Sequence, residues 1–196
     1  RRYRPEATSA ALAERASGHL VVIGYTNLGK RVREMTLTGG GAAVVVDADR
    51  AAVEEIIRAE EPLVLGNARE ATTLRAAGVE RAAVVVIASD DLETAAVACR
   101  HIRDVNPGCK LVVRCTDDDV GQLLAKAYNA RVLSTSKMAA KFILSQAQKV
   151  GARRAVIVGK NNVGRRAAEA LGAERIACEL IAETEDVEAL RKAGVA

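Results

Sequence analysis

Short apolar runs alternate with longer amphipathic segments along the first two thirds of the chain. The apolar runs are rich in Val and Ile, whereas the segments between them carry apolar residues at the spacing of a helix. Strands and helices that alternate through short loops build a parallel sheet with right-handed crossovers. We therefore expect an α/β fold with a doubly wound parallel sheet over residues 19–135. The pattern predicts strands at 20–24, 42–47, 62–65, 83–88, 110–115 and 131–133, and helices at 28–38, 50–58, 70–77, 91–104 and 117–127.

The first predicted βαβ unit contains a glycine turn of the kind that holds nucleotide phosphates. Gly24 ends the first strand, Gly29 lies at the start of the helix, and Asp47 ends the second strand. In such units the first glycine makes the tight turn and the last lets helix and strand approach, while an acid roughly 20 residues on binds a ribose hydroxyl. The middle glycine of the G-x-G-x-x-G pattern is replaced by Thr26, whose Cβ keeps the backbone farther from a pyrophosphate. The order of parts predicts a Rossmann-like nucleotide site whose ligand depends on Thr26.

Two segments lie outside this alternation. Residues 1–18 are polar and Ala-rich, and we expect a linker or a short helix leading into the first strand. Residues 136–150 follow a Ser-Thr-Ser cap and place Met138 and Phe142 on one apolar face at helical spacing. Because the predicted sheet is complete by residue 133, this helix either packs on the sheet edge or crosses to a second subunit.

The chain then repeats itself. Residues 154–165 repeat the strand, glycine turn and helix of residues 20–31, which indicates an internal duplication. We expect residues 151–196 to form a partial second Rossmann-like unit, either degenerate or incompletely represented in the sequence. This copy is shorter than the first, and we assign the missing stretch to its second strand and helix. The second copy is therefore expected to lack the ribose-binding acid.

Composition narrows the class of protein. With 49% hydrophobic but 2% aromatic residues, the core must consist of Val, Ile, Leu and Ala, as in buried parallel sheets. The 29 basic and 25 acidic residues are well mixed, and without a basic face or stacking aromatics we expect no nucleic-acid partner. The four cysteines lack metal or redox spacing and are typical of reduced thiols in a cytoplasmic protein. No apolar run reaches the roughly 18–20 residues of a membrane span, and the chain starts without Met, as a fragment of a longer protein would.

Several motifs of the first copy resemble, in order and spacing, the RCK family, whose members are also called TrkA-N or KTN domains. After the glycine turn and Asp47 come Gly66-Asn67-Ala68 and the Leu-Arg-Ala-Ala-Gly-Val run that starts at Leu74. Ala-Ser-Asp-Asp follows the fourth predicted strand, and Leu-Val-Val-Arg ends the fifth at Arg114. Members of this family are cytoplasmic regulatory domains of potassium channels and transporters, and some channels carry two of them in tandem.

The resemblance implies a regulatory rather than a catalytic function. Family members pair and assemble into a ring below a membrane pore, and a ligand acts on the gate through its different affinity for two ring states. The segment 136–150 matches the family's crossover helix, so we expect a homo-oligomer, a dimer that assembles into a ring. We further expect a gating-ring domain in the cytoplasm, joined to a membrane pore domain of the same or a partner chain. The alternatives are a regulatory subunit of a Trk/Ktr-type potassium transporter and a calcium-gated RCK domain.

The resemblance also assigns candidate site residues, with NAD or an adenine nucleotide (ADP, ATP or AMP) as the expected ligand. The turn glycines and the acid at the end of the second strand match positions that hold phosphates and the adenosine ribose, and two polar residues flank the turn. Asn67 stands where the family usually has an acid beside the adenine, and Arg114 has a counterpart near the cleft or forms a structural ion pair. The full set is Gly24, Thr26, Asn27, Gly29, Lys30, Asp47, Asn67, Ala68 and Arg114.

Three other functions compete with nucleotide sensing. Asp47 and Asp49 together could hold a hard cation such as Ca²⁺, which takes several oxygen ligands. An NAD-dependent dehydrogenase would need an acid or base at the nicotinamide, but the two histidines, His19 and His101, precede a strand and lie on a helix. We therefore expect no enzymatic activity. A pure assembly module that binds no ligand is the third alternative.

Overall fold

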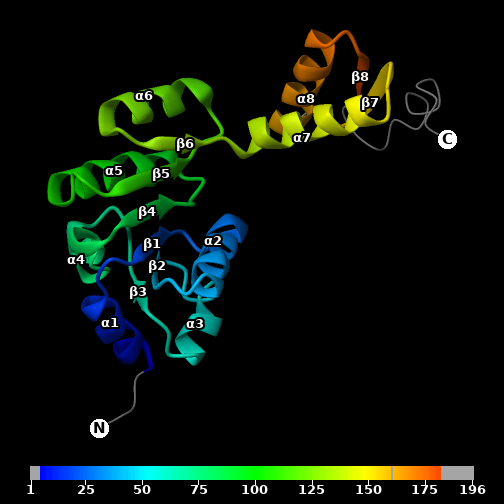
Figure 1. Ribbon diagram of the computed structural model, residues 1–196. Helices are drawn as coiled ribbons and strands as arrows, with labels where there is room; N and C mark the ends of the chain where they lie inside the picture. The colour runs from blue at the N-terminus through cyan, green and yellow to red at the C-terminus, as the bar shows by residue number, and fades with distance from the viewer. Residues whose placement is uncertain (1–4, 160, 182–196) are drawn as a thin grey trace. The chain divides into compact units, whose positions relative to one another are not determined.

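The computed structural model describes residues 5–159 and 161–181. The chain divides into two compact units, Arg1–Leu133 and Ser134–Ala196, and each is described by itself (Figure 1). The first unit contains a six-stranded sheet, and in the described part of the second unit a helix precedes a small βαβ motif.

The first unit is built on one six-stranded sheet in which every strand pairs in parallel. The strand order β3-β2-β1-β4-β5-β6 confirms the expected doubly wound α/β sheet, with strand order reversing between β1 and β4. The strands are β1 (Leu20–Ile23), β2 (Ala43–Asp47), β3 (Leu63–Leu65), β4 (Val84–Ile87), β5 (Lys110–Arg114) and β6 (Arg131–Leu133). The helices are α1 (Pro5–Arg15), α2 (Asn27–Thr38), α3 (Glu54–Arg58), α4 (Ala71–Ala76), α5 (Leu92–Val105) and α6 (Asp118–Tyr128), with a short 3₁₀ turn at Val79–Arg81.

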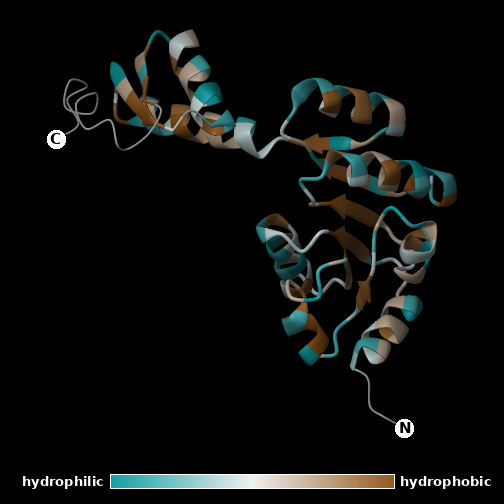
Figure 2. Ribbon diagram, turned by 180° about the vertical axis from the view of Figure 1, so that it is seen from behind, coloured by the Kyte–Doolittle hydropathy of each residue, from teal (hydrophilic) through white to brown (hydrophobic). Residues whose placement is uncertain are grey.

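Both faces of this sheet are covered, which explains why its central strands read as continuous apolar runs. Val21 and Ile23 of β1 belong to a cluster shared with buried residues of α1, α4, α5 and α6. Val22 of the same strand faces the other way and packs with residues of α2. A strand buried on both sides carries no polar alternation. Figure 2 shows the result as a hydrophobic sheet between helices of mixed hydropathy.

Two predicted segments, 50–58 and 1–18, differ from the structure in the extent of their helices. The helix expected at 50–58 is shorter, because residues 51–53 form turns and α3 begins at Glu54. Of the expected linker 1–18, residues 1–4 lie outside the described part, and α1 occupies most of the rest. This helix packs against the edge strand β3, and its Ser9 and Ala13 are fully buried. Covering an edge strand removes a surface on which other chains could add strands.

The second unit contains α7 (Thr135–Lys149), β7 (Arg154–Val158), α8 (Asn162–Ala173) and β8 (Ala177–Ile181), and its two strands pair in parallel. Our assignment of the missing stretch to the second strand is therefore wrong, since β8 is that strand. It was overlooked because Ala-Cys-Glu-Leu-Ile is a weak apolar run. The Gly159 N–H donates to Ile181 O at 2.7 Å, as the Gly24 N–H donates to Val46 O at 2.9 Å. The residue after Ile181, at the place of Asp47, is Ala182 and lies outside the described residues.

A close helix–strand contact is common to both units. A Cβ added to Gly29 would lie 2.2 Å from Gly24 O, and a Cβ on Gly164 would lie 2.1 Å from Gly159 O. The two turn glycines have φ values of 90° and 108°, a region that side chains disfavour. Each unit therefore needs a glycine at both positions to bring its helix N-terminus against the end of its first strand.

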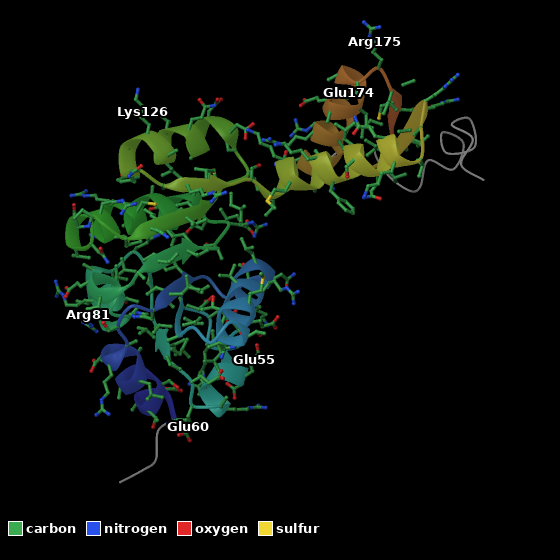
Figure 3. The ribbon with its side chains drawn as sticks, in the orientation of Figure 1. Glu55, Glu60, Arg81, Lys126, Glu174 and Arg175 are labelled. Carbon is green, nitrogen blue, oxygen red and sulfur yellow. The ribbon has the colours of Figure 1, made fainter. Side chains whose placement is uncertain are left out.

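A second buried feature lies where α1 leads into β1. His19 is 1% exposed. Its Nε2 lies 2.9 Å from Ala77 O, while its Nδ1 is buried without a partner in the described residues. Burial and the nearby Arg81 guanidinium lower the pKa of His19, against the opposing effect of the Ala77 bond. Arg81 itself donates to Ala16 O and Glu14 O (Figure 3), so a proton on His19 would enter a buried, already positive region.

We expect Gly29→Ala to destabilise the first unit by about 2–3 kcal/mol, because backbone must move to admit the methyl group. All three tyrosines lie in residues 1–133 and the chain has no Trp, so tyrosine fluorescence during urea unfolding follows this unit alone. Gly108→Ala is the control, since a Cβ there meets nothing within 4 Å. Equal unfolding midpoints for the two variants would contradict the close-contact argument.

We expect the first unit to lose stability as the pH falls below about 6.5, the pKa of histidine in an unfolded chain. The unfolded chain then binds a proton that His19 in the folded state resists, so the free energy of unfolding decreases by up to about 1.4 kcal/mol from about pH 7.5 to about pH 5.5. His19→Gln should flatten this slope in tyrosine-detected urea unfolding. The control His101→Gln removes the other histidine and should leave the slope in place; an unchanged slope in His19→Gln would refute the assignment.

Candidate functional site

A pocket of the first unit lies where the strand order reverses. Parallel α/β sheets bind ligands in the crevice beyond the carboxyl ends of the strands at this point. Here a pocket of about 190 Å³ is formed by the segments that follow β1, β2, β3 and β4. Of the predicted site residues, the structure brings Gly24, Thr26, Asp47, Asn67 and Ala68 together around it.

Asp47 holds the turn that forms the floor of the pocket. Its Oδ2 accepts the Tyr25 N–H at 2.6 Å, and its Oδ1 accepts the Asp49 N–H at 2.8 Å. A carboxylate offers about four lone-pair sites, so both oxygens can still accept a ligand hydroxyl. The acid at the end of β2 is thus oriented before any ligand arrives.

Thr26 is the N-cap of α2. Its backbone is extended, with φ −69° and ψ 174°, so this position does not require a glycine. The Oγ1 atom accepts the Gly29 N–H at 3.3 Å and donates to Ala88 O at 3.0 Å. The side chain therefore ties the start of α2 to the end of β4. The N–H groups of Asn27 and Leu28 have no protein acceptor within the described chain and give the helix start its positive character.

Asn67 and Ala68 lie in the loop between β3 and α4. Asn67 Oδ1 accepts the Arg69 N–H at 3.0 Å, which fixes the amide at the pocket edge. The amide nitrogen therefore remains as the donor that a ligand would meet, where an acid would offer acceptors only.

Arg69 was missed by the sequence reasoning. Its Nε donates to Thr94 Oγ1 at 3.0 Å. Its terminal NH2 group donates to Asp91 at 2.9 Å and Glu93 at 2.8 Å. The Thr94 hydroxyl and Arg69 hold the pKa of Asp91 at about 2. Arg69 thus joins the β3–α4 loop to the start of α5. The β4–α5 loop contributes Ser89 to the pocket, and the first turn of α5 contributes Thr94. The sequence has no motif that would predict this contact, because Arg69 and Asp91 are more than 20 residues apart.

Three predicted residues at the helix start, Asn27, Gly29 and Lys30, lie outside the pocket lining. Asn27 is exposed. Glu55 extends from α3 (Figure 3). Lys30 Nζ lies 3.7 Å from Glu55 Oε1 and 5.0 Å from the centre of the Tyr25 ring. The Tyr25 hydroxyl donates to Glu55 at 2.9 Å, and burial followed by this bond raises the pKa of Tyr25 to about 12. Lys30 is therefore engaged on the side of α2 that faces α3.

Arg114 also lies outside the pocket lining. It forms an ion pair with Asp90 in the β4–α5 loop, with 2.8 Å between Arg114 NH1 and Asp90 Oδ1. Of the two roles left open for this residue, the structure has the ion pair. The Arg114 side chain is 21% exposed, whereas its partner Asp90 is 62% exposed, so the pair lies at the surface with its guanidinium largely covered.

At the candidate cation site, carboxylate oxygens of Asp47 and Asp49 accept hydrogen bonds from backbone N–H groups. Asp49 Oδ1 accepts the Ala51 N–H at 2.9 Å, as Asp47 accepts the Asp49 N–H. In the part of the chain that the structure describes, no three His, Cys, Asp or Glu side chains are grouped to hold a metal ion. The two aspartates cap successive turns after β2.

In the second unit, Asn161 takes the place of Thr26. Its side chain caps α8 by accepting the Gly164 N–H at 2.9 Å.

All four cysteines of the chain are free thiols, and three of them are buried. No helix among residues 5–159 and 161–181 is long and apolar enough to cross a membrane.

Comparison with known proteins gives relatives in potassium transport. A putative K⁺ efflux antiporter KefB from Alkalimonas amylolytica is 28% identical over 100 residues, which cover 51% of this chain and 15% of that protein. The structure of GsuK bound to ADP is similar with a TM-score of 0.78 and 17% identity, over 93% of this chain and 52% of that chain. The GsuK channel bound to NAD gives 0.76 and 12%, over 92% of this chain and 52% of that one.

A third relative is the Kef CTD of Shewanella denitrificans in its AMP-bound form, with a TM-score of 0.59 and 18% identity over 80% of this chain and 91% of that chain. At such identities the solved structures show a shared fold. The chain spans about half of the GsuK chain and a smaller share of the antiporter. The TrkA-N domain family matches residues 20–135, which contain the whole six-stranded sheet and its pocket. The chain belongs to the TrkA-N domain family.

Proposed function

We propose that this chain is a ligand-sensing regulatory domain of a potassium-transport protein and that it binds an adenine nucleotide in the pocket at the switch point. The observation that carries the proposal is the preformed turn in which Asp47 and the N-terminus of α2 border one pocket. The solved relatives were obtained with ADP, NAD and AMP, which supports this class of ligand.

In this proposal each side of the pocket holds one part of the nucleotide. Asp47 accepts the ribose hydroxyls, the free N–H groups at the start of α2 bind phosphate, and Asn67 and Ala68 border the base. Asp47 is the only titratable side chain among the described residues that line the pocket. This supports binding without catalysis, because hydride transfer would need an acid or base at the reacting carbon.

A potassium channel with tandem domains is the form of transport protein that we favour. The similarity to GsuK extends over 93% of the chain and thus includes most of the second unit with its repeated glycine turn. The domain would then lie in the cytoplasm, in a ring below the pore, and would pass a ligand-dependent change in shape to the gate. The antiporter KefB is the reason to keep a transporter as the alternative, together with a Trk/Ktr-type subunit.

The thermal unfolding midpoint of the first unit, measured with each candidate ligand, should show which ligand binds. An adenine nucleotide at about 100 times its Kd should add about 2.7 kcal/mol of stability and raise the unfolding midpoint. ADP, ATP, AMP, NAD, NADH and CaCl₂ are added singly, and Asp47→Asn should abolish most of the shift caused by the nucleotide. Because this variant also loses a turn bond, the shift is compared within each variant. Asp104→Asn, on the exposed side of α5, is the matched control.

The absence of a shift with every nucleotide would refute the sensor function and favour an assembly module. A shift with CaCl₂ alone that Asp47→Asn removes would favour the calcium-gated alternative. A nucleotide shift that persists in Asp47→Asn would refute the assigned position of the ribose.

The helix at 136–150, observed as α7, is the proposed contact with a neighbouring subunit. It exposes Met138 and Phe142, at 58% and 65%. We expect Phe142→Glu to weaken self-association by about 1–3 kcal/mol, because a charge would enter an apolar interface. Sedimentation equilibrium measures the change in the dimer dissociation constant. Met35→Glu is the control, since Met35 on α2 is also 65% exposed. A monomeric wild-type chain, or equal effects of both substitutions, would contradict the role of α7.

A further inference from the structure

We propose that the pocket accepts a mononucleotide of the AMP, ADP or ATP class and excludes dinucleotides such as NAD. The inference rests on the proposed nucleotide function and narrows its ligand class. Solved relatives include both classes, so the fold alone does not decide between them.

A dinucleotide needs both sides of the switch point. Its pyrophosphate lies over the glycine turn, with one nucleoside beyond the strands on each side. The described residues that line the pocket follow β1, β2, β3 and β4, and none of them belongs to β5 or α6. The volume of about 190 Å³ is below the roughly 300–1,000 Å³ of typical ligand sites. The pocket therefore corresponds to one half of a dinucleotide site.

Thr26 closes the passage between the two halves. Its hydroxyl spans from the Gly29 N–H to Ala88 O, and so stands between the start of α2 and the end of β4. This is the place where a glycine would let the pyrophosphate approach. A dinucleotide would have to displace the side chain and leave Ala88 O without its donor. A terminal phosphate would not, since the N–H groups of Asn27 and Leu28 remain accessible at the helix start.

The ion pair of Arg114 and Asp90 closes the second half. Val113 pairs with Ile87 in the sheet, so Arg114 is one position further, beside Ala88. From there its guanidinium reaches both oxygens of Asp90, at 2.8 and 2.9 Å. The pair thus bridges the ends of β4 and β5, where the second nucleoside of a dinucleotide would lie. Opening this half would separate two charges that are well placed for hydrogen bonding.

The test is calorimetric titration of the whole chain with ADP, ADP-ribose and NAD. ADP-ribose carries the pyrophosphate and second ribose of NAD without its nicotinamide. We expect ADP to bind at least about tenfold more tightly than either larger ligand, because each of these must break bonds that it does not replace. Thr26→Gly combined with Asp90→Ala should reduce this preference about tenfold by strengthening the binding of NAD.

Two further variants test whether a changed ligand preference comes from Thr26 itself or from loss of folding. Thr26→Ser keeps the hydroxyl and should keep the preference for ADP, while Thr38→Gly, at the exposed far end of α2, is the control for a lost threonine. NAD that binds wild type as tightly as ADP would overturn the inference and leave nucleotide sensing intact. AMP and ATP are titrated in the same way, and binding of none of the five ligands would overturn both.

Discussion

The approach of a helix N-terminus to the end of a strand is the contact on which the rest of this chain depends. A methyl group at Gly29 would lie 2.2 Å from Gly24 O, and this closeness seats α2 on β1. With α2 in place, its N-cap Thr26 lines the pocket where the strand order reverses, and the turn brings the Tyr25 N–H to Asp47. The contact therefore determines the fold of the first unit and the position of its pocket at once.

The fold could be predicted because most of its determinants are local. Val- and Ile-rich runs buried on both faces mark the strands, and helical spacing marks the segments between them. The strand β8 escaped the same reasoning, since its five residues include Glu179 and owe their conformation to pairing with β7. A strand stabilised mainly by its partner leaves little trace in its own sequence.

The site could be predicted only in part, for a related reason. The turn and Asp47 are separated by a characteristic distance along the chain, and the structure brings them to one pocket. Arg69 is different, because its partners lie at the start of α5 and only the folded sheet brings them together. Lys30 lies beside the turn, as its sequence position indicates, but its Nζ is directed to Glu55 on α3, at 3.7 Å from Oε1. Sequence gives the position of a side chain along the backbone more readily than its direction.

The second unit separates what the glycine turn does for folding from what it does for binding. Gly159 and Gly164 repeat the close contact, and Asn161 repeats the cap that Thr26 provides. At the place of Asp47, however, the sequence has Ala182. Since the helix and strand still meet without the acid, the acid is not required for the βαβ geometry. What Asp47 adds in the first unit is therefore separate from the βαβ contact: it accepts the Tyr25 and Asp49 N–H groups and contributes a carboxylate to the pocket lining.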